Sequence, residues 1–407
     1  MTVDRRGWVC CHLGAREHYA VPRALQRRGR LTHLITDAWA HPRAWYGRLN
    51  GAVFGRLSQR YHGDLANASI HALTGSLVAH EVLWRARGRD GWDLLIARNE
   101  WFQKRAAAEL SALPAASPAA VFAHSYSAAE IFRQAKSRQW MTVLGQIDPG
   151  PRHYHLEAQL STARPEYGPA PESPPPRYFD NWRRECDAAD RIVVNSEWAR
   201  VSLVDEGVDA GKIAIVPLPY ESGHDAARHA RTYPEAFSAA RPMRVLFVGA
   251  ASVVKGAADL LEAFVALDDP RMELHLVGAR VMSIPVHLAR HPRVHWVGPV
   301  DRSKVMEYYR TSDVLAFPSH SDGFGMAQVE ARAAALPIIA SRHCGRVIED
   351  GQTGILLEAV SPDSLSAALQ RVVNEPTTLA KFSLRMQHGS AFGIDALADR
   401  LVALEHR

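Results

Sequence analysis

The sequence predicts an α/β protein made of two doubly wound domains, each a parallel sheet between layers of helices. The chain has 407 residues, which is too long for one ordinary core and favours two domains. Its second half contains apolar runs, most of them closed by Gly or Pro, that alternate with helix-length segments. This alternation is typical of a parallel sheet covered on both faces. The runs are 243–249, 272–278, 294–298, 313–318 and 336–341.

The first half opens with the same pattern. A strand is predicted at 8–14, where Gly14 makes a tight turn, followed by a helix at 15–29 and a strand at 31–37. A later strand ends at His124. Residues 163–179 are rich in proline, and we expect them to form a surface excursion of the first domain rather than a helix or a central strand.

The composition is that of a globular cytoplasmic protein. The chain is 47% hydrophobic and 22% charged, which excludes a disordered chain. No apolar run approaches 18 residues and the first residues lack a signal-peptide pattern, so we expect neither a membrane-spanning helix nor a leader. The four cysteines have neither metal-ligand spacing nor the pattern of a disulfide framework, which favours a reducing compartment.

The net charge of +5 is concentrated in the first part of the chain. Between residues 39 and 105, aromatic residues are interleaved with arginines. This mixture suits peripheral contact of the N-terminal domain with the inner face of a membrane, where cations meet phosphate. Helices that bury the aromatic rings and expose the arginines explain it equally well. We find no nucleic-acid-binding motif and expect no nucleic-acid partner.

Residues 313–341 carry the most informative pattern, a strand, a glycine-containing loop, a helix and a second strand. In an open parallel sheet, ligands bind beyond the carboxyl ends of the strands, where this loop lies. Asp322 in the loop and Glu330 in the helix are acids that can accept hydrogen bonds from hydroxyl groups. Gly323 and Gly325 allow close approach of a ligand to the backbone. The alternative is that Asp322 caps the helix and Glu330 is solvated.

This stretch, PSHSDGFGMAQVEARAAALPIIAS, resembles the E-x(7)-E signature of retaining glycosyltransferases of family 4, which have the GT-B fold. Asp322 stands where a Glu is usual, and Leu336 where a Gly is common. The segment AASVVKGAADLLEAF resembles the family pattern GRLxxxKGxxxLLxAF. It places Lys255 at the lysine of that pattern and Ala250 where an arginine is usual.

The resemblance implies a role for each matching residue. Lys255 is expected to bind the donor diphosphate, Glu330 the ribose hydroxyls of the nucleotide, and Asp322 the hydroxyls of the donor sugar. His124 is expected near the reacting sugar, which makes His124, Lys255 and Asp322 the predicted catalytic set. Backbone N–H groups are expected to contact the donor at Gly14, Gly323, Phe324 and Gly325.

The implied activity is transfer of a sugar from a UDP- or GDP-type donor, with retention and without a metal ion or cofactor. No Asp-x-Asp metal motif occurs in the sequence, which agrees with that class. The implied acceptor is a glycan, a lipid-linked molecule or a small molecule, in polysaccharide or glycoconjugate biosynthesis. Two alternatives remain open: a non-catalytic GT-B scaffold, suggested by Ala250 and Asp322, and a sugar-nucleotide epimerase.

The predicted domains follow from these patterns. Residues 1–221 form the N-terminal, acceptor-side domain and residues 222–242, which lack a strand pattern, form the linker. Residues 243–384 form the donor domain. The helical tail at 385–407 is expected to pack back on the first domain, as similar tails do in the family.

Overall fold

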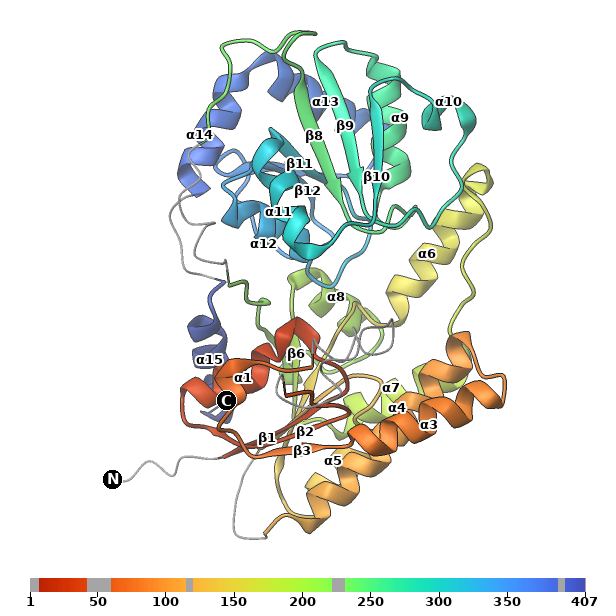
Figure 1. Cartoon of the computed structure of the whole chain (residues 1–407), viewed down its shortest axis with the longest axis vertical. Helices are drawn as coiled ribbons and strands as arrows, with labels where there is room; N and C mark the ends of the chain where they lie inside the picture. Colours follow the sequence, from red (N-terminus) through yellow and green to blue (C-terminus); the bar gives the residue numbers. More distant parts are fainter. Residues whose placement is uncertain (1–6, 42–59, 115–119, 222–230, 387–391, 407) are drawn as a thin grey trace.

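Two parallel sheets, each covered by helices, build the molecule (Figure 1). The computed structural model describes residues 7–41, 60–114, 120–221, 231–386 and 392–406. The strand order is β3-β2-β1-β4-β5-β6-β7 in the first sheet and β10-β9-β8-β11-β12-β13 in the second. In both sheets the order reverses beside the first strand, which is where such sheets bind ligands. The prediction of two doubly wound, Rossmann-like domains is confirmed.

The strands of the first sheet are apolar because helices cover both of its faces. Every residue of β1 (Trp8–His12) is buried. Alternate residues point to opposite faces, so Cys10 and Cys11 lie in different cores. The other strands are β2 (Leu31–Thr36), β3 (Ile70–Ala72), β4 (Ala120–His124), β5 (Met141–Gly145), β6 (Arg191–Val194) and β7 (Ile213–Ile215). The helices are α1 (Ala20–Arg27), α3 (Thr74–Ala86), α4 (Gly91–Ala112), α5 (Ala129–Lys136), α6 (Pro151–Ala163), α7 (Pro176–Ala188) and α8 (Glu197–Asp205).

The second sheet is built in the same way. Alternate residues of its first strand fill two cores, with Val245 and Phe247 on one face and Leu246 on the other. Its strands are β8 (Met243–Val248), β9 (Met272–Val277), β10 (Val294–Gly298), β11 (Val314–Phe317), β12 (Ile338–Ser341) and β13 (Gly354–Leu357). Its helices are α9 (Ala257–Leu267), α10 (Val286–Ala289), α11 (Arg302–Thr311), α12 (Met326–Ala333), α13 (Pro362–Asn374) and α14 (Pro376–Met386).

The first helix begins later than the sequence predicts. We expected a helix from residue 15, but α1 begins at Ala20 after a short 3-10 turn, η1 (Arg16–His18). Glu17, His18 and Tyr19 have φ angles of 45°, 52° and 60°, in the left-handed region. Such angles are uncommon outside glycine and asparagine, so nothing in these residue types predicts the break.

The expectation for the proline-rich segment holds for 168–175, which form neither helix nor strand, but it is wrong on either side of them. Helix α7 begins within it, because a proline in the first turn of a helix needs no N–H partner. The short turn η4 (Pro165–Tyr167) reaches the other domain, where Tyr167 is 2% exposed in the core of the second sheet. Its hydroxyl donates to Glu262 Oε1 at 2.6 Å. Helix α6 and η4 therefore bridge the two domains (Figure 1).

The last helix lies against the first. Helix α15 (Ile394–Val402) packs beside α1, and its apolar residues join a core of the first sheet (Figure 1). The end of the chain is held by a hydrogen bond of 2.6 Å from Trp8 Nε1 to Glu405 Oε1 and by an ion pair between Arg30 and Glu405. Within the described residues, α15 thus contacts α1 and shares its core with Trp8 and Cys10 of β1.

Parts of the predicted pattern lie outside the described residues. They include 222–230 of the predicted linker, 42–59 of the aromatic and arginine mixture, and 387–391 of the predicted tail. Within the part of the chain that the structure describes, no helix is both long enough and apolar enough to cross a membrane.

Candidate functional site

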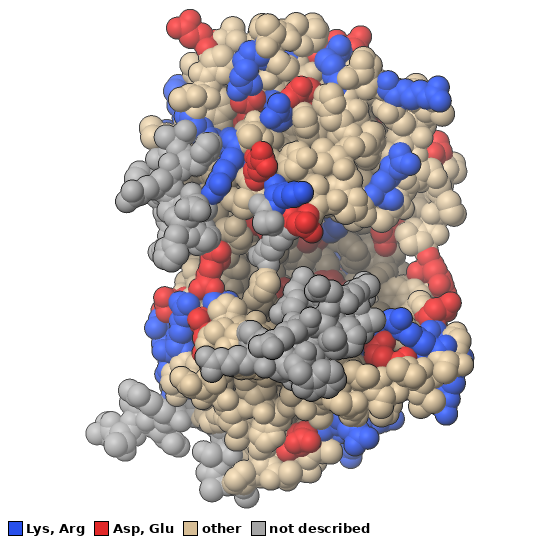
Figure 2. All heavy atoms as spheres, viewed as in Figure 1, with Lys and Arg blue, Asp and Glu red and all other residues tan. Residues whose placement is uncertain are grey.

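Two cavities adjoin each other, one lined by residues of both domains and the other by the first domain and α15. One is formed mainly by the ends of β8 and β11 and the start of α12, and the other by β4, β6 and the loop before α1. Ile147, Asn195 and Leu218 line both, so the cavities meet at these residues. The surface is visibly hollowed between the two halves of the molecule (Figure 2). We call them the donor cavity and the acceptor cavity, for the roles predicted above.

Lys255 and Asp322 form an ion pair in the donor cavity. Lys255 Nζ lies 2.7 Å from Asp322 Oδ2, and it also donates to the carbonyl of Ser321 at 3.4 Å. The other carboxylate oxygen of Asp322 accepts from Phe324 N at 3.1 Å. Asp322 therefore holds the loop in shape, whereas the cap position of α12 is taken by Gly325.

Two glycines make this arrangement possible. Gly256, directly after Lys255, has φ +69°, and a Cβ there would lie 2.0 Å from the carbonyl oxygen of Pro318. Gly325 has φ +86°, and its Cβ would lie 2.5 Å from the ring of Phe317. Because neither space nor conformation admits a side chain, α9 and α12 begin close against the end of β11.

Glu330, on α12, also lines the donor cavity. Its Oε2 accepts a hydrogen bond of 2.8 Å from the hydroxyl of Tyr309 on α11. Burial raises the pKa of Tyr309 well above its ordinary value, and the Glu330 carboxylate adds to the shift. Tyr309 therefore stays a hydrogen-bond donor, and the alternative of a merely solvated Glu330 is not what the structure contains.

Ser321 ties this loop to the first domain. Its Oγ accepts a hydrogen bond of 3.0 Å from Trp198 Nε1 on α8 and lies 3.0 Å from His153 Nδ1 on α6. Burial, then the nearby Lys255 charge, lowers the pKa of His153. Gly323 lies at the same contact between the loop and the first domain, because a Cβ at this position would be 3.1 Å from the carbonyl oxygen of Ile147. Gly323 thus faces the first domain rather than lining the donor cavity.

Two histidines end neighbouring strands of the first sheet. His124 ends β4 and lines the acceptor cavity, and the ring of His12, at the end of β1, lies 4.6 Å from it. Burial, and then Arg16, lowers the pKa of His12 to about 3, and burial also lowers that of His124 well below its usual value. Among the described residues neither ring nitrogen of His12 has a hydrogen-bond partner. Both imidazoles are therefore neutral and can donate as well as accept.

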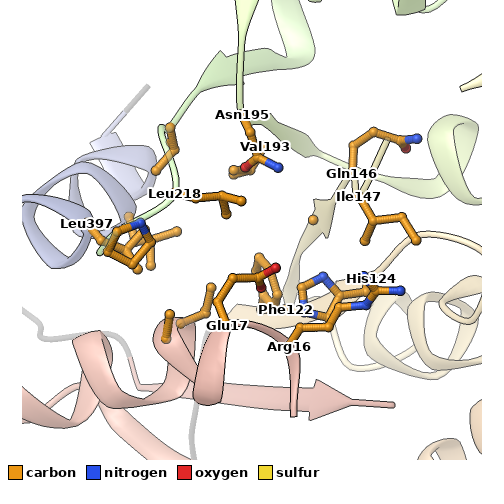
Figure 3. Close-up of a pocket in the computed structure, with 16 residues that line it drawn as sticks. Arg16, Glu17, Phe122, His124, Gln146, Ile147, Val193, Asn195, Leu218 and Leu397 are labelled. Carbon is orange, nitrogen blue, oxygen red and sulfur yellow. The ribbon is translucent and has the colours of Figure 1, made fainter. Parts of the chain in front are cut away.

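The strained turn before α1 faces these histidines. Non-glycine residues in the left-handed region each cost on the order of 1–2 kcal/mol, and three occur in succession here. Tyr19 anchors the turn through a hydrogen bond of 3.1 Å to Ala38 O. The result is that Arg16 and Glu17 project into the acceptor cavity beside His124 (Figure 3). Burial raises the pKa of Glu17, although the Arg16 charge opposes the shift.

Gly14 is not brought to either cavity. Its φ of +91° confirms the tight turn, but its N–H donates to Asp37 Oδ1 at 3.0 Å. Arg60 holds the same carboxylate oxygen at 2.8 Å. The N–H group that was expected to contact a ligand is therefore already used within the fold.

The donor cavity has no arginine where the family pattern has one. Ala250 lines it, and neither Arg280 nor Arg332 is among its lining residues. Arg280 lies over the ring of Trp296, and Arg332 donates to a backbone carbonyl. Among the described residues that line the two cavities, the Lys and Arg side chains are Lys255 and Arg16.

Comparison with known proteins assigns the second half of the chain. Residues 234–388 match the family model described as "Glycosyl transferases group 1". Residues 234–388 belong to this family. The group 1 segment contains Lys255, Asp322 and Glu330, so the donor cavity is built by the part of the chain whose family is assigned.

Curated relatives extend the likeness over more of the chain. D-inositol 3-phosphate glycosyltransferase 2 of Catenulispora acidiphila is 30% identical over 52% of this chain. The D-inositol 3-phosphate glycosyltransferase of Kineococcus radiotolerans is 29% identical over 66%. The match spans only 55% of the first relative's length and 68% of the second's.

Solved structures agree in fold over nearly the whole chain. Sucrose-phosphate synthase from Thermosynechococcus elongatus superposes with a TM-score of 0.65 at 17% identity, covering 98% of each chain. Anabaena HepE in complex with UDP-glucose gives 0.60 at 15% identity, covering 98% of this chain and 99% of its own. The first domain and the domain that contains the group 1 segment together thus have the GT-B fold, as expected from the sequence.

The structure therefore gathers most of the predicted residues and adds others. Lys255, Asp322, Phe324, Gly325 and Glu330 line the donor cavity and His124 lines the acceptor cavity. Sequence reasoning missed further residues, from other elements, that line the two cavities or contact their lining residues or the loop that contains Asp322. These are His12, Arg16, Glu17, His153, Trp198, Tyr309 and Ser321. The position of His12 at a strand end, like that of His124, was the one signal available.

Proposed function

We propose that the protein transfers a sugar from a nucleoside diphosphate sugar of the UDP or GDP type to a hydroxyl group of an acceptor. The transfer retains the anomeric configuration and uses no metal ion or cofactor. The observation that carries the proposal is the Lys255–Asp322 pair beside Glu330, at the strand ends of a group 1 segment. A relative in fold, HepE, was crystallised with UDP-glucose, which supports this class of donor.

In this proposal the donor separates the ion pair. The diphosphate takes the Lys255 ammonium, and Asp322 is released to accept hydrogen bonds from the donor sugar. A charge-assisted hydrogen bond of this kind contributes roughly 1.5–3 kcal/mol. Glu330, held by Tyr309, accepts from the ribose hydroxyls. The ion pair keeps both side chains in place when no donor is bound.

Arg16 supplies the second cation for the diphosphate, in place of the arginine that the family has at position 250. It lies in the acceptor cavity, which meets the donor cavity at Ile147, Asn195 and Leu218. Among the described residues its guanidinium makes no hydrogen bond or ion pair, and the strained turn directs it into the cavity. The charge is thus provided by the first domain instead of the second.

The chemical step needs stabilisation of the leaving phosphate. The bond between the anomeric carbon and the phosphate oxygen breaks, and a bond from the acceptor oxygen forms on the same face. The acceptor proton passes to the leaving phosphate oxygen. Lys255 and Arg16 stabilise the negative charge that grows on that phosphate, which is the main contribution expected of the protein. Two side-chain cations and the lack of an Asp-x-Asp motif support a metal-independent step.

The acceptor occupies the cavity of the first domain. His124, neutral, donates to a hydroxyl or phosphate oxygen near the reacting carbon, and Glu17 accepts from an acceptor hydroxyl. A glycan, a lipid-linked molecule or a small polyol meets this requirement, and so does a phosphorylated polyol such as the one in the names of the curated relatives. The product belongs to polysaccharide or glycoconjugate biosynthesis.

The first domain also contacts the inner face of the membrane peripherally. Support comes from helix α3, where Val78, Val82 and Leu83 are 48%, 66% and 41% exposed. The side chain of Arg85, beside them, is 65% exposed. Apolar side chains flanked by arginines suit an anionic lipid surface. Sedimentation with anionic vesicles tests this, and V82D is expected to reduce binding while neutral vesicles bind neither form.

The deciding experiment is a thermal-shift panel of UDP-, GDP- and ADP-sugars, followed by mass spectrometry of the transfer products. We expect one nucleotide class to raise the melting temperature, and Glu330→Ala to abolish the rise. Equal stabilisation of the variant would overturn the ribose role. Binding without transfer to any acceptor would instead favour a non-catalytic scaffold, and a new sugar nucleotide formed without acceptor would favour an epimerase.

A further inference from the structure

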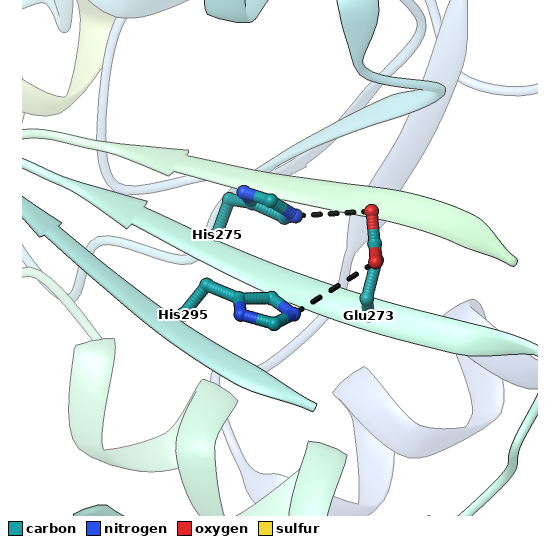
Figure 4. Close-up of side chains that lie close together, drawn as sticks. All are labelled: Glu273, His275 and His295. Carbon is teal, nitrogen blue, oxygen red and sulfur yellow. Dashed lines mark hydrogen bonds and ion pairs between the residues drawn. The ribbon is translucent and has the colours of Figure 1, made fainter. Parts of the chain in front are cut away.

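Three potential metal ligands lie together on the second sheet, and none of them is among the residues that line the donor cavity. Glu273 and His275 are on β9, and His295 is on the neighbouring strand β10 (Figure 4). One ligand atom from each residue lies within 4.8 Å of the other two. The mechanism proposed above uses none of these side chains.

The strand geometry brings them to one face. Residues two apart on a strand point to the same side, which aligns Glu273 with His275. The parallel register pairs His275 directly with His295 on the edge strand. The intervening residue, Leu274, points into the core on the opposite face. The arrangement is therefore fixed by the backbone of two paired strands rather than by mobile loops.

The spacing suits coordination of one ion. His275 Nε2 lies 3.0 Å from Glu273 Oε1, and His295 Nε2 lies 3.8 Å from Glu273 Oε2. The two imidazole rings are 4.7 Å apart. A tetrahedral ion with bonds of about 2.0–2.2 Å needs ligand atoms roughly 3.3–3.6 Å apart. Small side-chain rotations are enough to reach that geometry.

The surroundings favour a site that solvent can reach. The side chains of Glu273 and His275 are 19% and 16% exposed, and that of His295 is 44% exposed. Arg244 Nε contacts Glu273 Oε1 at 2.7 Å, so it orients the carboxylate and leaves Oε2 facing His295. A competing cation this close weakens the site but does not occupy the position between the two imidazoles.

We propose that Glu273, His275 and His295 bind a transition-metal cation of the Zn²⁺ class, with water as the fourth ligand. Two imidazoles and one carboxylate suit Zn²⁺, Ni²⁺ or Cu²⁺ and not Mg²⁺ or Ca²⁺, which prefer oxygen ligands. On binding, His275 Nε2 gives its proton to solvent and its lone pair to the metal. The ion then joins the edge strand β10 to β9 and stabilises the sheet.

The test uses the full chain after treatment with EDTA, titrated with Zn²⁺ and separately with Mg²⁺. We expect Zn²⁺, but not Mg²⁺, to raise the melting temperature, and calorimetry to give one tight site. His275→Ala and His295→Ala should each weaken this site at least tenfold. The four cysteines are buried, so they do not compete for the ion.

A second histidine pair provides the matched control. The rings of His33 and His71 lie 5.3 Å apart on the first sheet, and His71 contacts one carboxylate. His71→Ala should leave the tight site intact. Equal Zn²⁺ affinity in wild type and His295→Ala, or loss of the site in His71→Ala, would overturn the proposal. Because His295 is half exposed, its variant is expected to fold even if His275→Ala does not.

Discussion

Lys255 and Asp322 neutralise each other across 2.7 Å in the donor cavity. Both come from the same domain, on the loops after β8 and β11, so the pair does not depend on how the two domains are placed. A donor that binds Lys255 through its diphosphate has to replace this contact. The balance between the ion pair and the ligand therefore sets the donor affinity.

The first prediction concerns Lys255. Lys255→Met should weaken UDP or GDP binding roughly 10- to 100-fold, because one charge-assisted hydrogen bond to the diphosphate is lost. Affinity for the free nucleoside should change little. Calorimetry with both ligands checks this, and Lys381→Met, on an exposed position of α14, serves as the control. Equal losses for nucleoside and nucleotide would mean that Lys255 acts on the fold instead.

The second prediction concerns the missing arginine at position 250. Arg16→Ala should lower kcat/KM at least tenfold, because the diphosphate loses a cation. Ala250→Arg should restore much of the activity in that background, since it places a cation where the family pattern has one. A structural role for Arg16 would not be rescued from the other domain. Initial rates of the single and double variants, at matched melting temperatures, decide between the two.

The third prediction concerns Glu330 and its partner. Glu330→Gln should reduce the preference for UDP over its 2′,3′-dideoxy form, because the carboxylate accepts from the ribose hydroxyls. Tyr309→Phe, which removes the 2.8 Å hydrogen bond that holds Glu330, should have a smaller effect in the same direction. Competition binding measures both. An unchanged preference in Glu330→Gln would remove Glu330 from the ribose site.

The fourth prediction concerns pH. The pKa of His12 is about 3 in the folded protein, against about 6.5 when unfolded. At pH values between these two, His12 binds a proton in the unfolded chain but not in the folded protein. The contribution of His12 to the free energy of unfolding is therefore complete above about pH 6.5 and decreases as the pH falls. The slope is at most about 1.4 kcal/mol per pH unit for this group.

His12→Phe should therefore lose less free energy of unfolding than wild type between pH 7.5 and 5.0, by about 2 kcal/mol. Urea unfolding at the two pH values measures the difference. His287→Ala, at an exposed position, is the control and should behave as wild type. The same acid-induced loss in His12→Phe and wild type would show that His12 does not control it.

The second domain could be predicted closely because its strands are buried on both faces. A strand such as β8 then reads as a continuous apolar run, and its end marks where ligands bind. Lys255, Asp322 and Glu330 follow such ends in the sequence, so their convergence was predictable. Their contacts with Tyr309 and Ser321 were not, because these depend on how α11 and the first domain pack.

The first domain was harder because its features come from backbone conformation. The left-handed turn at Glu17 to Tyr19 uses residue types that also occur in helices, so a helix was predicted through it. The prolines of 163–179 predict that this segment forms no helix, but α7 begins at one of them. The burial of Tyr167 in the other domain has no local signal in the sequence.

The anchoring of Tyr167 has a consequence for how the cleft opens. Helix α6 begins after Gly150 with Tyr154 packed against a core of the first domain, and the chain turns back after Gly168, with φ angles of +71° and +102° at these glycines. Because Tyr154 is held by the first domain and Tyr167 by the second, the segment between the glycines is a strap fastened at both ends. Opening of the cleft is then expected to bend this strap, so the domains swing apart only as far as it allows instead of separating freely.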